Sequence, residues 1–145
     1  MTISRLQIVN AARRWIGTPF HHQASRLQAG CDCLGLVRGV WRDLIGSEPE
    51  EAPPYGLDWA AVTGVDYLNE ALGRHFTQID IWRYRAGDVL VFRFRPHGPA
   101  THLGIATSPE QMIHAHSGGS VTETTFGLHW RRRLVGAFIF PGVND

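Results

Sequence analysis

The sequence predicts an α+β domain in which N-terminal helices pack on an antiparallel β-sheet. Apolar residues recur at helical spacing in the first half of the chain, and after residue 87 they alternate with a period of two. Gly, Pro and Ser also divide the second half at positions where turns would join short strands. Helices that precede strands in chain order are typical of α+β domains, in which the helices cover one sheet face.

Length and composition predict a single domain spanning residues 1–145. The chain has 43% hydrophobic residues, with five Trp and seven Phe among its 145 residues, which is enough to build a core. Its formal net charge of +1 favours neither direct nucleic-acid binding nor attachment to a membrane surface. No run of apolar residues has the length of a signal-peptide core or a membrane span, so we expect synthesis in the cytoplasm without a signal peptide.

Three helices are expected before the strands. The first covers residues 3–16, is capped by Thr2 or Ser4 and ends at the Gly-Thr-Pro of residues 17–19. The second covers residues 33–45, and the third covers residues 59–72 after a Pro-rich loop. The apolar stripe of the second helix consists of Leu36, Val37, Val40, Trp41 and Leu44.

Five short strands are expected in the second half, where the period is two. Turn residues separate them, and Asp88 is expected to set the turn that enters the first one. The predicted strands are residues 87–94, 101–108, 111–117, 120–126 and 134–141.

The stretch Gly-Cys-Asp-Cys-Leu-Gly-Leu-Val at residues 30–37 contains both cysteines of the chain. A disulfide between Cys31 and Cys33 would close a tight, strained ring, so both are expected to be free thiols or ligands. Cys33 falls in the first turn of the second helix, where free N–H groups and the helix dipole favour a thiolate and could hold an oxyanion. A buried cysteine that packs as a small apolar residue is the alternative.

A thiolate nucleophile needs a base, and the base needs an orienting group. His102 opens the motif His-Leu-Gly-Ile-Ala in one predicted strand and His114 lies in the next, and the turn Ser-Pro-Glu-Gln between the strands could bring the two imidazoles side by side. His116 lies one strand period beyond His114 and is the alternative third residue.

These segments taken in order resemble a known family. The order Asp-Cys-Leu-Gly-Leu-Val, His-Leu-Gly-Ile and Met-Ile-His-Ala resembles the NlpC/P60 family of papain-like cysteine peptidases. That family usually has Asp-Cys-Ser-Gly-Leu, then His-Val/Leu-Gly-Ile, then Ile-His-Ala. The stretch from Gly17 to Trp41 is similar to the peptidase subfamily encoded in phage and gene-transfer-agent tail clusters.

The resemblance implies a Cys-His-His cysteine peptidase with a papain-like fold and no metal or organic cofactor. Cys33 matches the nucleophile, His102 the general base and acid, and His114 the residue that orients His102. Asp32 matches the acid before the cysteine, a candidate for shaping the loop or holding a substrate amine. Phe20 stands on the substrate side of the site, where the family usually has a tyrosine, and Leu34 replaces the usual serine.

The resemblance also implies that the protein is a peptidoglycan endopeptidase. Such an enzyme would cleave stem peptides at the bond between D-glutamate and a diamino acid such as diaminopimelate. Its expected partners are the stem peptides and the proteins of a phage-like or gene-transfer-agent tail or baseplate, with neither direct nucleic-acid binding nor membrane insertion. The tail would carry the domain to the cell wall or periplasm and so aid DNA delivery.

Two alternatives remain open at this point. One is a structural tail component that has kept a peptidase fold without needing catalysis, which the phenylalanine at position 20 favours. The other is a zinc site, for which His21, His22, Cys31 and Cys33 supply donor types that zinc accepts.

Overall fold

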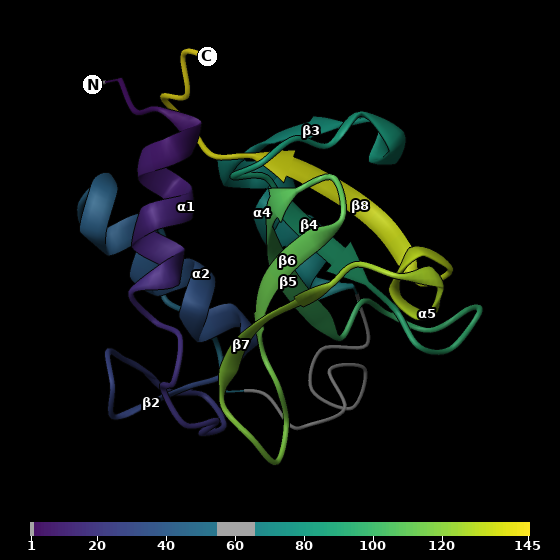
Figure 1. The fold of residues 1–145 in the computed structure, drawn as a ribbon, viewed down its shortest axis with the longest axis horizontal. Helices are drawn as coiled ribbons and strands as arrows, with labels where there is room; N and C mark the ends of the chain where they lie inside the picture. Colours follow the sequence, from purple (N-terminus) through teal and green to yellow (C-terminus); the bar gives the residue numbers. More distant parts are fainter. Residues whose placement is uncertain (1, 55–65) are drawn as a thin grey trace.

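The computed structural model describes residues 2–54 and 66–145. Helices α1 and α2 lie side by side on one face of a six-stranded antiparallel sheet (Figure 1). The predicted α+β class, with N-terminal helices packed on an antiparallel sheet, is confirmed. The two chain ends lie together, since Ile3 and Val143 form a parallel β-bridge.

Helix α1 runs from Arg5 to Arg13 and α2 from Cys33 to Leu44. Ser4 caps α1, because its hydroxyl accepts the Gln7 amide while the Gln7 side chain returns to the Ser4 amide. The predicted first helix was longer by about a turn at its C-terminal end. Gly39 lets α2 approach the first helical segment, since a Cβ there would lie 2.0 Å from the ring of Trp15.

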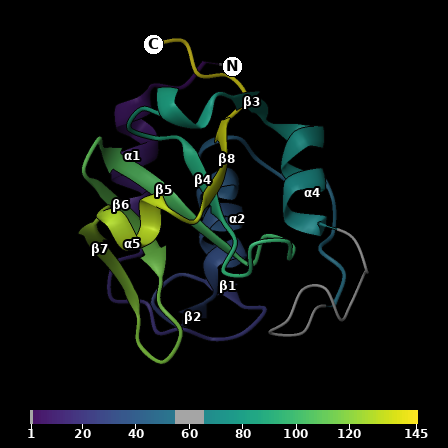
Figure 2. The ribbon, with the colours of Figure 1, turned by 90° about the vertical axis from the view of Figure 1, so that its right-hand side faces the viewer.

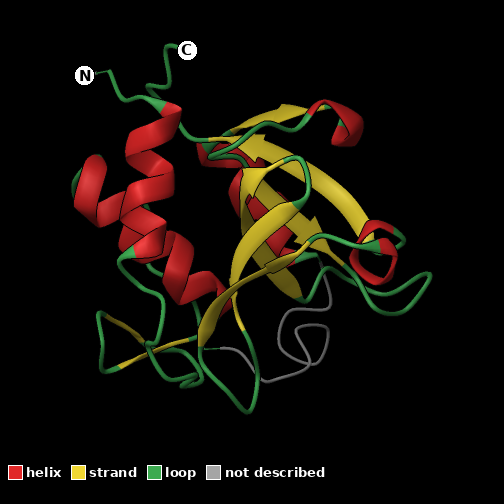
Figure 3. Cartoon of the chain, viewed as in Figure 1, coloured by secondary structure: helices red, strands yellow, loops and turns green. Residues whose placement is uncertain are grey.

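The sheet has the strand order β3-β8-β4-β5-β6-β7, with antiparallel pairing throughout. Figure 3 shows the strands in yellow and the helices in red. All five predicted strands are present, each shorter by one or more residues than its predicted range. The strand β3 was missed because it contains only three residues, too few for an alternating pattern. The bounds are Thr77–Ile79 for β3, Val89–Phe92 for β4, His102–Ser108 for β5, Gln111–Ala115 for β6, Val121–Thr125 for β7 and Leu134–Ile139 for β8.

Four smaller elements complete the described residues. Helix α4, Tyr67–His75, lies beside β3 and β8 (Figure 2). It starts and ends later than the predicted third helix, whose residues 59–65 lie outside the described part of the chain. The other three elements were not predicted. One is a hairpin formed by β1 (Ser25–Arg26) and β2 (Gly30–Cys31). The others are the 3₁₀ turn η1 (Ile81–Arg83) and the short helix α5 (Leu128–Arg131).

Alternate side chains of the central strands enter two separate apolar clusters. Val89 and Val91 belong to the larger cluster, which includes side chains of α1 and α2. Leu90 and Phe92 belong to the second cluster, against which the half-buried Trp130 of α5 packs. The sheet therefore separates the Cys33 helix from α5, and β4 contributes to the core on both sides.

Asp88 enters β4 as predicted, by accepting the backbone amide of Arg85. Its other oxygen pairs with Arg5 of α1 at 2.6 Å, and Asp88 is almost fully buried. This ion pair ties the first helix to the sheet. No helix among the described residues is both long and apolar enough to cross a membrane.

Candidate active site

Cys33 is the first residue of α2, and its side chain is buried. Asp32 is the N-cap in an extended conformation, and its Oδ1 accepts the Gly35 amide at 2.8 Å. The backbone N–H groups of Cys33, Leu34 and Leu103 lie near the sulfur, where they favour its thiolate form. Since Leu103 follows His102 in β5, the sulfur lies next to the start of that strand.

Burial dominates the acidity of this thiol. Desolvation and the nearby Asp32 carboxylate raise the pKa of Cys33 to about 12, although the three backbone N–H groups partly offset the increase. The expectation that the helix N-terminus would give a resting thiolate is therefore wrong for this structure. The reason is that Sγ lies inside the protein beside an anion, where the helix dipole is outweighed.

His102 and His114 meet on one face of the sheet. His102 Nε2 lies 2.8 Å from His114 Nδ1, and the two rings are nearly perpendicular. Gly104 leaves the space that this contact needs, since a Cβ there would lie 2.9 Å from Met112 Sδ and 3.6 Å from His114 Cβ. The predicted juxtaposition of the two imidazoles on neighbouring strands is thus present.

Both imidazoles are neutral near pH 7. Burial, assisted by the neighbouring His114 and His116, lowers the pKa of His102 to about 3. Burial and His116 lower the pKa of His114 to about 4. The thiol and the two imidazoles are therefore all neutral at rest, and the described residues include no hydrogen bond between Cys33 and His102.

His116 is in a weaker position than His114. Its ring centroid lies 5.9 Å from that of His114, and its side chain is exposed just after the end of β6. His102 is hydrogen-bonded to His114, which favours His114 over His116 as the orienting residue.

Asp32 and Phe20, predicted on the substrate side, both lie close to the cysteine loop. Asp32 Oδ2 accepts the Gln23 amide at 2.8 Å, so both carboxylate oxygens bind backbone N–H groups of the loop and helix. Phe20 is half-buried, and its backbone pairs with Cys31. These contacts give Asp32 a role in shaping the loop, and substrate contact by either residue stays a prediction.

The donors of the zinc alternative do not form a cluster. His21 is exposed, whereas Cys31 is buried beneath the loop. Across residues 2–54 and 66–145, no three His, Cys, Asp or Glu side chains converge closely enough to hold a metal ion. The donor set thus offers zinc no site in this part of the chain.

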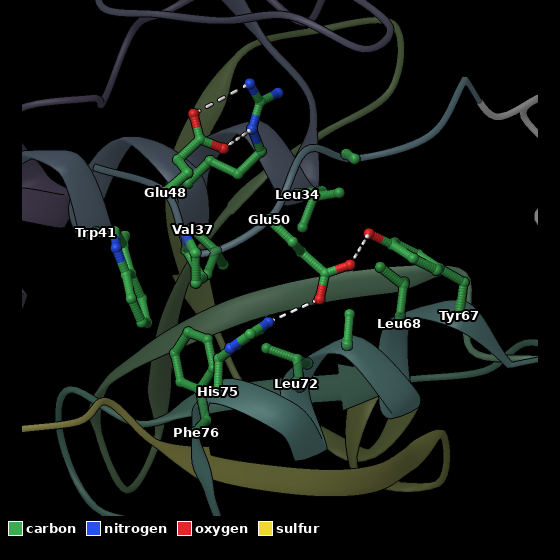
Figure 4. A pocket seen from close by; sticks show the side chains of 14 residues that line it. Leu34, Val37, Trp41, Glu48, Glu50, Tyr67, Leu68, Leu72, His75 and Phe76 are labelled. Carbon is green, nitrogen blue, oxygen red and sulfur yellow. Dashed lines mark hydrogen bonds and ion pairs between the residues drawn. The ribbon is translucent and has the colours of Figure 1, made fainter. Parts of the chain in front are cut away.

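A pocket of about 60 Å³ lies between α2 and α4, starting at Leu34 beside Cys33 (Figure 4). Two carboxylates from the loop after α2 lie along it, and each binds basic side chains. Glu48 pairs with Arg38 and Arg42 of α2, while Glu50 binds Tyr67, Arg74 and His75 of α4. Apolar walls come from Val37, Trp41, Leu68, Leu72 and Phe76.

One side chain of the site was missed by the sequence reasoning. Trp130 of α5 stacks on His102 with ring centroids 5.1 Å apart and an angle of 25° between the planes. Its ring also meets the ring of His114 at 5.1 Å, edge to face. A single tryptophan in a four-residue helix has no periodicity, and nothing in the sequence places it on this face of the sheet.

Comparisons with known proteins point to one family. The family model described as "NlpC/P60 family" matches residues 17–139. The fold is similar to that of an NlpC/P60 family protein from Bacillus cereus, with TM-score 0.71, 17% identity and coverage of 97% of this chain and 41% of that chain. It is also similar to the NlpC/p60 domain of the peptidoglycan hydrolase SagA, with TM-score 0.63, 26% identity and coverage of 94% of this chain and 98% of that chain.

A third similar structure is NlpC2 from Trichomonas vaginalis, with TM-score 0.68, 18% identity and coverage of 97% of this chain and 48% of that chain. The chain thus spans less than half of the Bacillus and Trichomonas proteins but nearly all of the SagA domain. Among curated proteins, none matches the chain.

Proposed function

This chain belongs to the NlpC/P60 family, and from that membership we propose that it is a cysteine peptidase that hydrolyses peptidoglycan. The observation that carries the proposal is the arrangement at the start of β5. There the Leu103 amide lies close enough to the Cys33 sulfur to lower the pKa of the thiol, while the adjoining His102 is hydrogen-bonded to His114 at 2.8 Å. A thiol, an imidazole and an orienting group are the parts that acyl transfer through a cysteine requires.

The role of His102 as a base determines which nitrogens carry protons. His102 must donate through Nε2–H to His114 Nδ1, which leaves its own Nδ1 unprotonated and able to accept the thiol proton. His114 then carries its proton on Nε2. In this tautomer His114 orients the ring of His102 and stabilises the imidazolium that forms during the reaction.

The reaction starts from a neutral thiol, so proton transfer accompanies attack. The Cys33 sulfur bonds to the peptide carbonyl carbon as its proton passes to His102 Nδ1. The tetrahedral intermediate then expels the amine, which takes that proton. Water attacks the thioester while giving a proton to His102, and the thiolate leaves and recovers it.

The helix N-terminus is suited to hold the oxyanion. Asp32 already accepts the Gly35 amide, but the amides of Cys33 and Leu34 lie in the first turn and near the sulfur in the resting site. When the carbonyl carbon bonds to Sγ, its oxygen comes within reach of these N–H groups.

The proposed substrate is a peptidoglycan stem peptide, and the proposed bond joins D-glutamate to a diamino acid such as diaminopimelate. Similarity to SagA, which is described as a peptidoglycan hydrolase, supports the substrate class. The stretch from Gly17 to Trp41 supports a further proposal, that the domain acts at the cell wall as part of a phage-like or gene-transfer-agent tail.

Mass spectrometry of purified sacculi incubated with the protein tests the activity and the bond together. Wild-type protein should release fragments whose new N-terminus is the diamino acid. Cys33→Ser should release none, because the hydroxyl is a far weaker nucleophile of similar size. Cys31→Ser is the matched control, since it makes the same change at a buried thiol two residues away and should keep the activity.

Sacculi left intact by folded wild-type protein over a range of pH would contradict the enzymatic role. The structural tail component would then be the better description. The proposed place in a tail is tested separately, by asking whether particles that carry Cys33→Ser assemble normally but deliver DNA poorly through an intact wall.

A further inference from the structure

Trp130 has no part in the acyl-transfer steps, although it contacts both imidazoles of the candidate site. Its ring stacks on His102 and meets His114 edge to face, with both centroids 5.1 Å away. Phe92 and Phe94 also pack against it, at centroid distances of 5.1 and 5.9 Å. The hydrogen bond between the two histidines is therefore covered by aromatic rings on this side of the sheet.

Two arginines that follow Trp130 in the sequence hold the short helix α5 in place. Arg131 donates to the carbonyls of Phe126 and Pro109, and its guanidinium lies over the Phe126 ring. Arg133 donates to the His129 carbonyl at 2.7 Å and lies over the ring of Phe94. Residues 131–133, which could be taken for a solvated turn, thus include two arginines that anchor α5 against the sheet.

These contacts restrict the motion of one ring in particular. His102 opens β5, so no residue of its own strand precedes it, and its side chain depends on neighbours for orientation. The hydrogen bond to His114 fixes one ring nitrogen but still allows rotation about the line joining the two nitrogens. A flat ring stacked at 25° to the imidazole restricts that rotation.

We propose that Trp130 is a positioning residue, whose stacked ring holds the plane of His102 and shields the His102–His114 hydrogen bond from water. This inference rests on the proposed function, since it assigns a task to Trp130 in proton transfer with the thiol. Trp130 acts through His102, and its effect is on the rate of the chemical step.

The surroundings of the pair are consistent with a shielding role. The titratable group that acts on both histidines is His116, just after β6, while His129 lies against Trp130 and Arg133 over Phe94. Burial is the first cause that keeps His102 neutral, and the indole is part of what buries it. Removing the indole would admit water to the imidazole.

The test compares Trp130→Leu with Trp130→Phe. Leucine keeps apolar contact with Phe92 but removes the flat ring, whereas phenylalanine restores a smaller one. We expect kcat on stem peptides to fall about 10- to 100-fold in Trp130→Leu, with KM changed less than about threefold, and to recover largely in Trp130→Phe. Leu128→Ala is the matched control, because it trims α5 at a side chain that is 62% exposed.

A second readout needs no activity. In NMR titrations of the histidine side chains, wild-type His102 should stay neutral through the pH range in which an ordinary imidazole, with pKa about 6.5, gains its proton. In Trp130→Leu it should gain a proton at a higher pH than in wild type, and in Trp130→Phe it should behave nearly as in wild type. His102→Gln identifies the signal.

The two readouts separate the inference from the function on which it rests. An inactive wild-type protein with the expected titration shift would refute the peptidase and leave the shielding intact. Active protein in which Trp130→Leu changes neither kcat nor the titration would overturn the inference. A rise in KM alone, or a Trp130→Phe variant as impaired as Trp130→Leu, would overturn it too, because either result indicates direct contact of the indole with substrate.

Discussion

Alkylation of Cys33 by iodoacetamide reports directly on the state in which the resting site holds its thiol. Burial and Asp32 raise the pKa of Cys33 to about 12, and burial keeps His102 neutral. A thiol with that pKa is ionised in roughly one molecule in 10⁵ at about pH 7. Ionising it costs about 4 kcal/mol more than ionising an ordinary cysteine.

The pH dependence of the alkylation rate follows from this fraction, because the thiolate is the reactive species. Each added pH unit raises the thiolate fraction about tenfold, so the rate should climb about tenfold per unit from about pH 7 to about pH 10. The alkylation rate of His102→Gln protein should rise with pH by the same factor, since a neutral imidazole does not stabilise the resting thiolate. Peptide mapping after a short exposure measures labelling at Cys33 separately from Cys31.

Replacing the neighbouring carboxylate tests the electrostatic cause. Asp32→Asn removes a charge that raises the pKa of Cys33, and alkylation at a fixed pH should become about tenfold faster. Asparagine still caps α2, but only one amide oxygen remains to accept from Gly35 or Gln23, which should cost about 1–2 kcal/mol of stability. Asp43→Asn, at the far end of the same helix, is the matched control for an altered charge.

A rate that is already high near pH 6 and flat up to about pH 9 would refute this reasoning, since it would reveal a preformed thiolate–imidazolium pair. If Asp32→Asn protein instead kept the wild-type dependence of alkylation rate on pH, Asp32 would not be a cause of the raised pKa of Cys33.

Two further predictions concern the orienting histidine and the loop beside α4. His114→Ala should lower kcat about 10- to 100-fold while His116→Ala leaves it within about threefold, because only His114 is hydrogen-bonded to the base. Steady-state assays on stem peptides measure both, and a larger loss in His116→Ala would reassign the third residue. Glu50→Gln should lower the free energy of unfolding by about 1 kcal/mol at neutral pH. This loss is smaller than the pKa shift alone would give, because 31% of the Glu50 side chain is exposed and solvent screens its ion pairs. Hydrogen bonding from Arg74 lowers the pKa of Glu50 to about 2 from its ordinary 4.5, so this stabilisation is complete above about pH 4.5 and is lost as the pH falls toward 2. Urea unfolding of both proteins at several pH values checks this, and a difference that persists below about pH 2 would contradict it.

The alternation of apolar residues was sufficient to predict the five longer strands, because one residue in two of β4 and β5 faces each apolar cluster. The three residues of β3 are too few for a period, and their pairing with β8 depends on the position of that strand in the sheet. Helix α2 was predicted to within a residue, since its apolar residues recur at helical spacing and pack into the cluster between the helices and the sheet. The hairpin of β1 and β2 has no such pattern, because it is held by backbone pairing at Ser25 and Arg26.

The sequence by itself determined which residue types could do the chemistry and how the strands bring them together. His102 and His114 lie on neighbouring strands joined by a tight turn, so local pairing brings them to the same end of the two strands. The register continues from the Ile105–Ile113 pair to place His114 opposite Gly104, and the tertiary structure shows that its ring reaches His102. Their protonation was decided only by the tertiary structure. The helix dipole that favours a thiolate is a local property visible in the sequence, whereas desolvation depends on what the rest of the chain places around the sulfur and the rings. Desolvation and the Asp32 carboxylate keep the Cys33 thiol neutral, while burial, to which the distant indole of Trp130 contributes, keeps His102 neutral.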